Sequence, residues 1–387
     1  MSDKIYEPQE ESFMLREEVR KHARGRFLDM GTGSGILAQA AQECPKVTDI
    51  LAVDLNPHAV RYVRKLGINA IKSDLFKKVT GKFDTIVFNA PYLPEDMREK
   101  KDEHSMAVCG GKHGYEITER FFDQVSEHLA SDGIILLLFS SLTNKQKVDS
   151  IIKERLFESK QLVDKRYFFE NVYIYLVRKS DLLNELGSKH LKDIKFFAKG
   201  KRGIVYKADY LEKKVAIKVE SPMSKAVARI KNEINMLKEL NRYGIGPEFY
   251  FSDTTWFVMD FIEGERIIDF LKNASARHAR QAVINVLKQL FELDYLGINK
   301  EELNHPYKHI IIDRNLHPVL IDFERAKKTI NPKNISQFVQ FLISKKINLI
   351  LDEKRIYINK RKMLEIVNSY KKNLDKEHFQ SIIDEIK

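Results

Sequence analysis

The stretch RFLDMGTGSGILAQAAQEC, residues 26–44, constrains the fold more than any other part of the chain. A short apolar run ends in a glycine-rich turn, and a segment with the composition of a helix follows at once. The same order of strand and helix recurs to about residue 178, with VTDILAVDLN and FDTIVFNAPY as further strands and YEITERFFDQVSEHL as a late helix. This alternation predicts a doubly wound, mainly parallel α/β sheet that binds ligands at the carboxyl ends of its strands.

The pattern changes after about residue 180, which predicts a second domain. DLLNELGSKHLKDIKFF is predicted to be a helical connector, and AKGKRGIVYKADYLEKKVAIKVE contains two strand-like runs joined by a turn. A helix-rich remainder follows and ends in lysine-rich amphipathic segments over 346–387. A sheet followed by helices is typical of an α+β domain. We therefore predict a first domain over 1–180, a linker over 181–190, and a second domain over 191–387 with a C-terminal helical extension.

Composition narrows the possible locations and partners of the chain. No stretch approaches the roughly 18 to 20 uninterrupted apolar residues of a membrane span, and the acidic start MSDKIYEPQEESF lacks the pattern of a secretory signal. The two cysteines, Cys44 and Cys109, favour neither a disulfide framework nor a metal site, so we expect a cytoplasmic protein. Residues 1–180 are nearly neutral, whereas residues 181–387 carry 38 basic and 28 acidic side chains. This excess indicates either a polyanionic partner, such as RNA or the ribosome, or lysine-rich solvated faces.

Three strand ends of the first domain carry residues suited to a nucleoside ligand. Gly31, Gly33 and Gly35 follow the first strand, where glycine lets the backbone approach a ligand and the next helix presents free N–H groups. Asp54 ends the second strand, where an acid can bind a ribose hydroxyl pair, and Asp74 ends the third, where it can accept from an adenine amino group. The glycine motif alone also fits dinucleotide binding, and each acid alone could merely cap a helix.

The fourth strand ends in the unusual sequence FNAPYLP. The set as a whole resembles the class I, Rossmann-like, S-adenosylmethionine-dependent methyltransferases with an Asn-Pro-Pro-Tyr motif, which modify nitrogen attached to a planar carbon. By this resemblance, Asn89 and the carbonyl of Ala90 accept both N–H hydrogens of the target, Pro91 keeps the preceding residue extended, and Tyr92 lies against the planar group. Here Ala90 replaces the first proline of the motif, so some stiffness is lost. The resemblance implies catalytic roles for Asn89, Pro91 and Tyr92, and cofactor contacts from Gly31, Thr32, Gly33, Gly35, Asp54, Leu55, Asp74, Leu75 and Asn89.

The N-terminal stretch YEPQEESFML resembles the segment that precedes the donor loop in the compact HemK-like (PrmC-related) glutamine methyltransferases of archaea and eukaryotes. Their substrate is the Gly-Gly-Gln loop of the class-one translation release factor, and they often need a small zinc-binding activator protein. By resemblance, Glu11 and Ser12 help to close the donor site, and Gly110 and Gly111 lie near the substrate entrance. We therefore expect a protein-glutamine N-methyltransferase. Methylation of adenine in DNA or RNA remains the alternative, because the same motif can hold either planar amine.

The second domain resembles the protein-kinase N-lobe in KGKRGIVYKA and VAIK, and in LIDFERA where Asp-Phe-Gly belongs. The resemblance implies ATP with Mg²⁺ as ligands and pairs Lys218 with Glu233 on the following helix. It places the adenine-binding hinge at residues 259–263 and makes Asp322 the metal ligand, with Glu324 in place of the motif glycine. The implied ATP-binding residues are Gly200, Gly203, Lys218, Glu233, Asp260, Ile262, His309 and Asp322.

Departures from the kinase pattern leave phosphate transfer open. Asn304 occupies the position of the usual catalytic base, and His309 that of the second metal ligand. The stretch HPYKH and the later IDFERA look like an archaeal group of predicted serine/threonine kinases distantly akin to the RIO and Bud32 families. Lys308 and His309 could stabilise phosphate charge and His305 could replace the base, although a purely structural role is the commoner one for either histidine. The alternative to a kinase is a non-catalytic nucleotide sensor or docking module.

Overall fold

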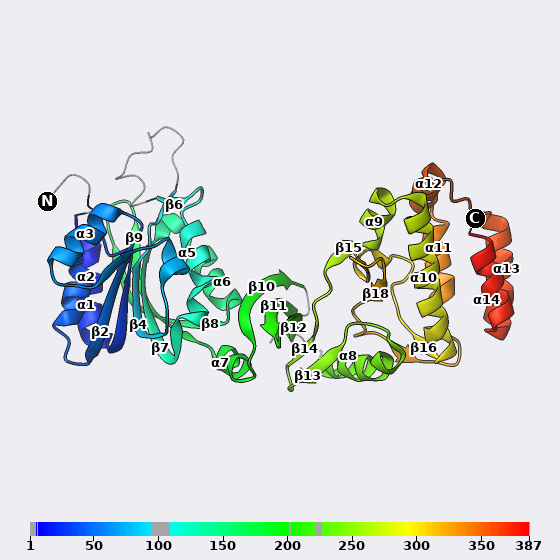
Figure 1. Cartoon of the computed structure of the whole chain (residues 1–387), viewed down its shortest axis with the longest axis horizontal. Helices are drawn as coiled ribbons and strands as arrows, with labels where there is room; N and C mark the ends of the chain where they lie inside the picture. Colours follow the sequence, from blue (N-terminus) through cyan, green and yellow to red (C-terminus); the bar gives the residue numbers. More distant parts are fainter. Residues whose placement is uncertain (1–4, 6, 95–108, 201–202, 221–226, 387) are drawn as a thin grey trace. The chain divides into compact units, whose positions relative to one another are not determined.

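The computed structural model describes residues 5, 7–94, 109–200, 203–220 and 227–386. Two compact units can be distinguished by their internal contacts: residues 1–196 with 208–211, and residues 197–207 with 212–387. Each unit is described by itself below (Figure 1). Across the described ranges, every helix is too short or too polar to cross a bilayer.

The first unit is built on a seven-stranded sheet in the order β3-β2-β1-β4-β7-β9-β8. The first five strands in this order run parallel, and β9 and β8 complete the sheet as antiparallel strands. The prediction of a mainly parallel sheet is therefore confirmed, and the antiparallel pairs lie at the β8 edge. The strands are β1 (Gly25–Met30), β2 (Val47–Asp54), β3 (Ala70–Lys72), β4 (Phe83–Asn89), β7 (Leu129–Ser140), β8 (Phe157–Arg166) and β9 (Asn171–Lys179).

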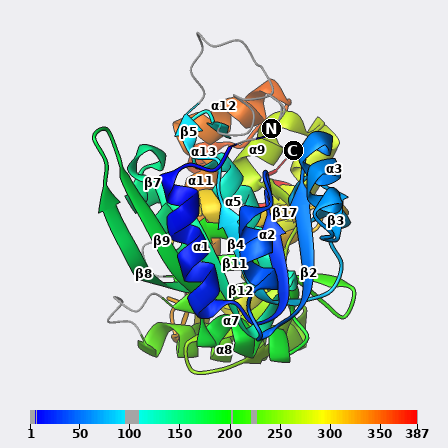
Figure 2. The same cartoon turned by 90° about the vertical axis from the view of Figure 1, so that its left-hand side faces the viewer.

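Helices cover both faces of this sheet, as Figures 1 and 2 show. Leu15 of α1 and Leu37 of α2 pack with Val87 on one face, whereas Phe121 of α5 and Ile151 of α6 pack on the other. Successive residues of a strand point to opposite faces, so a strand covered on both sides has to be apolar throughout. The helices are α1 (Glu10–His22), α2 (Ile36–Gln42), α3 (Pro57–Lys65), α5 (Glu116–Phe122), α6 (Lys145–Glu154) and α7 (Asp181–Ser188).

Two predicted helices are shorter in the structure than the sequence indicates. The late helix of the first domain ends at Phe122 and is followed by a 3-10 turn over Val125–Glu127. The predicted connector is helical only over Asp181–Ser188, and its second half forms strand β10 (Lys192–Lys199). The helical prediction for residues 192–197 was therefore wrong. His190, just after the helix, takes a left-handed backbone conformation that α-helix does not allow, and pairing with β11 stabilises the extended chain that follows.

A second sheet has the order β10-β11-β12-β14-β13; parts of β10 and β11 fall in the first unit by the division above, and the other three strands and a helical part belong to the second unit. Strand β14 pairs antiparallel with both β12 and β13. The remaining strands of this sheet are β11 (Gly203–Tyr210), β12 (Lys213–Glu220), β13 (Phe249–Ser252) and β14 (Trp256–Asp260). Helix α8 (Val227–Leu240) follows β12 in the chain. A small three-stranded sheet is formed by β15 (Gly264–Arg266), β17 (Ile310–Asp313) and β18 (Pro318–Leu320). A two-stranded sheet is formed by β16 (Ile298–Asn299) and β19 (Lys327–Lys328).

Further helices of the described residues contribute to the core of the second unit. The predicted C-terminal helices are present, and a buried polar network ties one of them to the core. Asp294 of α10 accepts from Asn334 and from the Ile335 N–H, so it caps α11, and it also accepts from the Tyr370 hydroxyl of α13 at 3.0 Å. The helices are α9 (Ile267–Asn273), α10 (Ala276–Tyr295), α11 (Asn334–Leu342), α12 (Lys345–Glu353), α13 (Lys360–Asn373) and α14 (Lys376–Asp384).

Candidate functional site

A pocket opens at the carboxyl edge of the first sheet, where β1 lies between β2 and β4. The order of the strands reverses at this point, which is where open α/β sheets bind their ligands. The pocket brings together the predicted strand ends. It is lined by Met30, Gly31, Gly33, Val53, Asp54, Leu55, Asn56, Ala59, Ser73, Asp74, Leu75, Phe88, Asn89, Ala90, Pro91, Tyr92, Leu93, Cys109, Ile117 and Arg120.

The glycine turn and the acid that ends β2 form one hydrogen-bonded unit. The Gly33 N–H donates to Asp54 Oδ2 at 2.9 Å, and the Asn56 N–H donates to Asp54 Oδ1 at 2.8 Å. Gly33 has φ of +51°, a left-handed conformation that a side chain would strain. Burial raises the pKa of Asp54, while these N–H groups oppose that shift. Two predicted cofactor residues lie outside the pocket lining: Thr32 is buried, and Gly35 packs against Val63.

Asp29, the penultimate residue of β1, was missed by the sequence analysis. Its Oδ2 accepts from Thr32 Oγ1 at 2.7 Å and from the Ala38 N–H at 3.2 Å. Its Oδ1 is buried and bonds to no donor in the described part of the chain. Burial raises the pKa of Asp29 to about 7. Asp29 lies outside the pocket lining, and its hydrogen bonds hold the glycine turn against the first turn of α2.

Asp74 lies in the pocket as predicted, but it already has partners. Arg120 Nη2 of α5 donates to both its carboxylate oxygens at 2.8 Å, and Lys77 Nζ donates to Oδ2 at 2.7 Å. The hydrogen bond from Lys77 lowers the pKa of Asp74, and Arg120 adds to this effect. A carboxylate can accept about four hydrogen bonds, so Asp74 can still receive an amino group. Arg120 is a second residue that the sequence analysis missed.

The Asn-Ala-Pro-Tyr stretch leaves two acceptors unused beside the pocket. Asn89 Nδ2 donates to Ser12 Oγ of α1 at 3.5 Å, while Asn89 Oδ1 receives no hydrogen bond from the described residues. The Ala90 N–H donates to the Leu138 carbonyl at 3.3 Å, and the Ala90 carbonyl accepts from none of the described N–H groups. Tyr92 is half-buried, and its pKa is raised mainly by burial, so its phenol stays neutral.

A short two-stranded sheet holds the backbone of this stretch. Strand β5 (Leu93–Pro94) pairs in parallel with β6 (Cys109–Gly111). A Cβ atom added to Gly110 would lie 2.5 Å from the Pro91 carbonyl oxygen. Only glycine allows so close an approach between the two segments. Gly110 and Gly111 therefore lie beside the candidate site.

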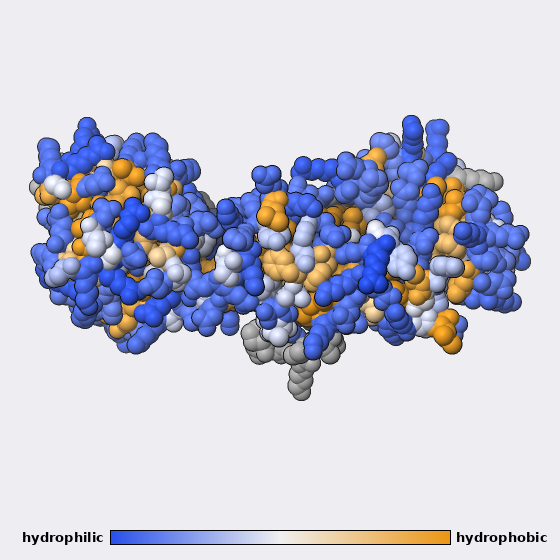
Figure 3. Space-filling model, turned by 60° about the horizontal axis from the view of Figure 1, so that its bottom comes forward, coloured by the Kyte–Doolittle hydropathy of each residue, from blue (hydrophilic) through white to orange (hydrophobic). Residues whose placement is uncertain are grey.

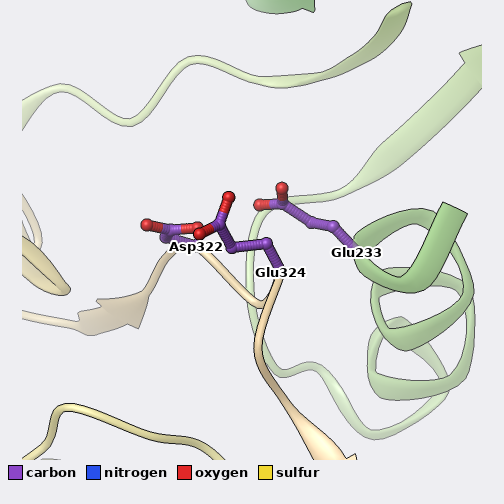
Figure 4. A group of neighbouring side chains, drawn as sticks. All are labelled: Glu233, Asp322 and Glu324. Atoms are coloured by element: carbon purple, nitrogen blue, oxygen red, sulfur yellow. The ribbon is translucent and has the colours of Figure 1, made fainter. Parts of the chain in front are cut away.

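In the second unit, one lysine joins two carboxylates from distant parts of the chain. Lys218 Nζ of β12 lies 2.5 Å from Glu233 Oε2 of α8 and 3.4 Å from Asp322 Oδ1. Burial opposes the charge on Lys218, but the two carboxylates outweigh it and raise its pKa. Figure 4 shows the carboxylates of Glu233, Asp322 and Glu324 turned toward one another; one ligand oxygen from each lies within 4.8 Å of the others.

Lys300, fully buried beside this cluster, was also missed by the sequence analysis. Its Nζ donates to the carbonyls of Ile321 and Asp322, at 2.7 and 2.5 Å. Burial lowers the pKa of Lys300 to about 8. Asp322 has a left-handed φ of +65°, and Lys300 holds this strained backbone in place. Burial alone would raise the pKa of Asp322, but Lys218 and Lys300 lower it, so the carboxylate is ionised.

Of the other predicted residues of the second unit, His309 adjoins this cluster, and Gly200, Gly203 and Asp260 lie at or next to the ends of strands. His309 lies between Glu302, at 3.1 Å from Nε2, and Asp322, at 3.8 Å from Nδ1. The Gly200 N–H donates to the Gly203 carbonyl, and the intervening residues 201 and 202 lie outside the described part of the chain. Asp260 ends β14 and accepts from the Tyr250 hydroxyl, Ile262 is half-buried two residues further on, and Asn304, His305 and Lys308 are exposed.

The fold and pocket of the first unit define a class I methyltransferase, and its residues fit S-adenosylmethionine. The acid Asp54, which can accept from ribose hydroxyls, and the apolar side chains of Leu55, Leu75 and Ile117 line the pocket and suit a nucleoside. Residues 9–170 match the family model of the methyltransferase small domain. A putative protein N5-glutamine methyltransferase of Methanocaldococcus jannaschii is 37% identical over 158 residues, which cover 38% of this chain and 79% of that protein. Through its first unit, the chain therefore belongs to the HemK-like family of S-adenosylmethionine-dependent methyltransferases.

Further relatives differ in how much of their own length is matched. Methyltransferase HEMK2 of Homo sapiens is 28% identical over 171 residues, which cover 39% of this chain and 78% of the human protein. Release factor glutamine methyltransferase of Deinococcus radiodurans is 29% identical over 132 residues, 31% of this chain; the chain spans about half of that protein, 48%. The solved Mtq2–Trm112 complex of E. cuniculi, responsible for methylation of the eRF1 translation termination factor, has 27% identity and a TM-score of 0.39, covering 46% of this chain and 99% of that one.

Proposed function

We propose that the first unit methylates the side-chain amide of a glutamine in a protein, and that this protein is a class-one translation release factor. The observation that carries the proposal is the pair of unused acceptors, Asn89 Oδ1 and the Ala90 carbonyl, at the pocket beside Tyr92. An amide –NH₂ has two hydrogens in one plane, so two acceptors can orient it. The names of the archaeal and bacterial relatives support glutamine as the target.

The residues of the site act by positioning. Bound S-adenosylmethionine supplies an electrophilic methyl group. The amide nitrogen is a poor nucleophile because its lone pair is delocalised, and hydrogen bonds to Asn89 and Ala90 increase the electron density on nitrogen. Pro91 keeps Ala90 extended, and the neutral ring of Tyr92 packs against the planar amide. Asn89 and Ala90 would hold the amide in place for methylation, and the nitrogen would release one proton to solvent when it is methylated.

Adenine in DNA or RNA is the second candidate target, because the same acceptors can orient its exocyclic amine. The near-neutral charge of residues 1–180 favours a protein, since a nucleic-acid substrate is usually held by many lysine and arginine contacts to phosphate. Lysine is disfavoured as a target, because an ammonium group has no delocalised lone pair to restore.

Transfer of label from radiolabelled S-adenosylmethionine tests the proposal. Release factor, duplex DNA and RNA are supplied separately, each with and without a small zinc-binding activator of the kind that the family resemblance suggests. Label in the release factor should disappear when the glutamine of its Gly-Gly-Gln loop is changed to alanine. Asn89→Ala should lower kcat/KM at least about 100-fold, whereas Asn69→Ala, an exposed amide outside the pocket, should not. Label in nucleic acid alone would refute the glutamine target.

For the second unit, we propose a kinase-like module that binds ATP with Mg²⁺. The ion pair between Lys218 and Glu233, and the proximity of Asp322, support it, because a lysine held by a glutamate and a metal-binding aspartate are the parts that a protein kinase uses to hold its nucleotide. The basic character of residues 181–387 supports RNA or the ribosome as a further partner.

Calorimetric titration with Mg-ATP tests nucleotide binding, and Asp322→Ala should abolish it. Labelled phosphate should reach the protein itself or a candidate substrate if the module is a kinase. Binding without transfer would instead favour a nucleotide sensor, a role consistent with the exposed Asn304 amide in place of a catalytic base.

A further inference from the structure

Four exposed hydrophobic side chains between residues 7 and 196 lie on segments at one edge of the first sheet. Most of the surface drawn in Figure 3 is hydrophilic, and hydrophobic residues form only small groups on it. Among the described residues between 7 and 196, five large hydrophobic side chains are strongly exposed: Phe13, Leu55, Leu142, Phe168 and Phe169. Phe168 and Phe169 stand out, with 92% and 87% of their surface exposed. Leu55 lines the cofactor pocket; the other four form what we call the hydrophobic rim.

The strand pairing places the rim at the same edge as Asn89. Because β4 runs parallel to β7 and β9 runs antiparallel to β7, the end of β7 lies beside the start of β9, as the pairing of Ser140 with Val172 shows. The turn between β8 and β9, which carries Phe168 and Phe169, therefore lies at the carboxyl edge. Figure 2 shows this turn at the same end of the sheet as β5 and the start of α1.

Hydrogen bonds connect the elements that carry the rim. The Asn171 N–H donates to Ser141 Oγ at 3.0 Å, which joins the β8–β9 turn to the segment that holds Leu142. Phe13 adjoins Ser12, whose Oγ accepts from Asn89. The segments that carry the rim therefore also carry partners of the candidate methyl-acceptor site.

The β8–β9 turn is anchored next to Tyr92. The Tyr167 N–H donates to the Glu170 carbonyl at 2.7 Å, which closes the turn. Tyr167 packs in the same hydrophobic cluster as Tyr92, while the rings of Phe168 and Phe169 contact each other edge to face at 4.7 Å. The turn thus has an inner side fixed against the site and an outer side that exposes two aromatic rings.

We propose that the hydrophobic rim is the docking surface for the folded protein that presents the target glutamine. This inference rests on the proposed function of the first unit. Exposed aromatic side chains next to a site are typical anchors of protein–protein contacts, and monomeric proteins seldom expose them without such a role.

Charge and hydrogen-bonding capacity favour a polypeptide over a nucleic acid at the rim. Lys165 is paired with Glu10 at 3.4 Å, so part of the local positive charge is neutralised. Glu170 Oε2 is buried and receives no hydrogen bond from the described residues. The negative charge of a carboxylate in the turn repels phosphate, which disfavours a nucleic acid at the rim.

The test compares an intact release factor with a short Gly-Gly-Gln peptide as methyl acceptors. In the full chain, Phe168→Ser with Phe169→Ser should raise KM for the release factor at least tenfold. The kcat, the KM for S-adenosylmethionine and kcat/KM for the peptide should stay within twofold, because the peptide is too short to reach the rim. Phe168→Leu with Phe169→Leu should restore most of the affinity, and Tyr295→Ser, at an aromatic of the second unit that is 75% exposed, should have no effect.

Several results would overturn the inference. An unchanged KM for the release factor in the serine variant would do so, as would an equal loss with the peptide, which would indicate damage to the site itself. If the serine changes instead weakened nucleic-acid methylation, dissociated a dimer in sedimentation or released the activator, the rim would bind a different partner. Absence of any glutamine label with the wild-type chain, with or without activator, would refute the proposed function and is detected separately, before the variants are compared.

Discussion

Asp29 gives the first unit a pH-dependent stability that can be calculated. Burial raises its pKa from 3.8 to about 7, so between these values the folded chain keeps a proton that the unfolded chain loses. The stabilisation is fully present below the unfolded pKa and is lost as the pH rises through about 7. With one pKa unit equal to about 1.4 kcal/mol, the free energy of unfolding should fall by about 2 to 3 kcal/mol between pH 5 and pH 8 from this group alone.

Asp29→Asn removes the titration and retains an oxygen that can accept from Thr32, so the difference between wild type and variant isolates the effect. Urea unfolding at pH 5, 6, 7 and 8 can be followed by far-UV circular dichroism. The single tryptophan, Trp256, lies buried in the second unit, and its fluorescence identifies that unit's transition. The wild-type advantage over Asp29→Asn should shrink as the pH rises. If the two curves stayed parallel to within about 1 kcal/mol, Asp29 would not be a buried, protonated acid.

Three further substitutions test other parts of the structure. Gly110→Ala forces a methyl group against the Pro91 carbonyl. It should lower kcat for methyl transfer at least tenfold and lower the free energy of unfolding of the first unit by about 1 to 3 kcal/mol. Gly187→Ala, with open space around its Cβ, is the matched control for both measurements. Lys300→Met leaves two carbonyls without their donor. It should lower the free energy of unfolding of the second unit by about 2 to 4 kcal/mol, measured by urea unfolding with tryptophan fluorescence. It should also weaken Mg-ATP binding, measured by calorimetry. Asp294→Ala removes the cap of α11 and should lower the same unfolding free energy by about 3 kcal/mol; an unchanged midpoint would contradict the role of this network.

The sequence predicted the central part of the first fold because its signals are local. An apolar run, a glycine turn and a helical segment each depend on neighbours in the chain, so β1, α2 and β4 follow from composition and spacing. Strands β8 and β10 were not predicted. Their residues alternate apolar with charged side chains, and only pairing with a neighbouring strand decides that such a segment is extended.

The residues of the candidate site also differ in whether a local sequence signal identifies them. Residues at strand ends, such as Asp54 and Asn89, could be predicted because parallel strands bring their carboxyl ends to one edge. Arg120 and Lys300 could not, because each acts by reaching a partner far away in the sequence, and an arginine in a helix or a lysine in a loop gives no local signal. The same holds for the hydrophobic rim. Two phenylalanines in a row read as ordinary core residues until the topology places both in a turn at the edge of the site, with no element of the described first unit covering them.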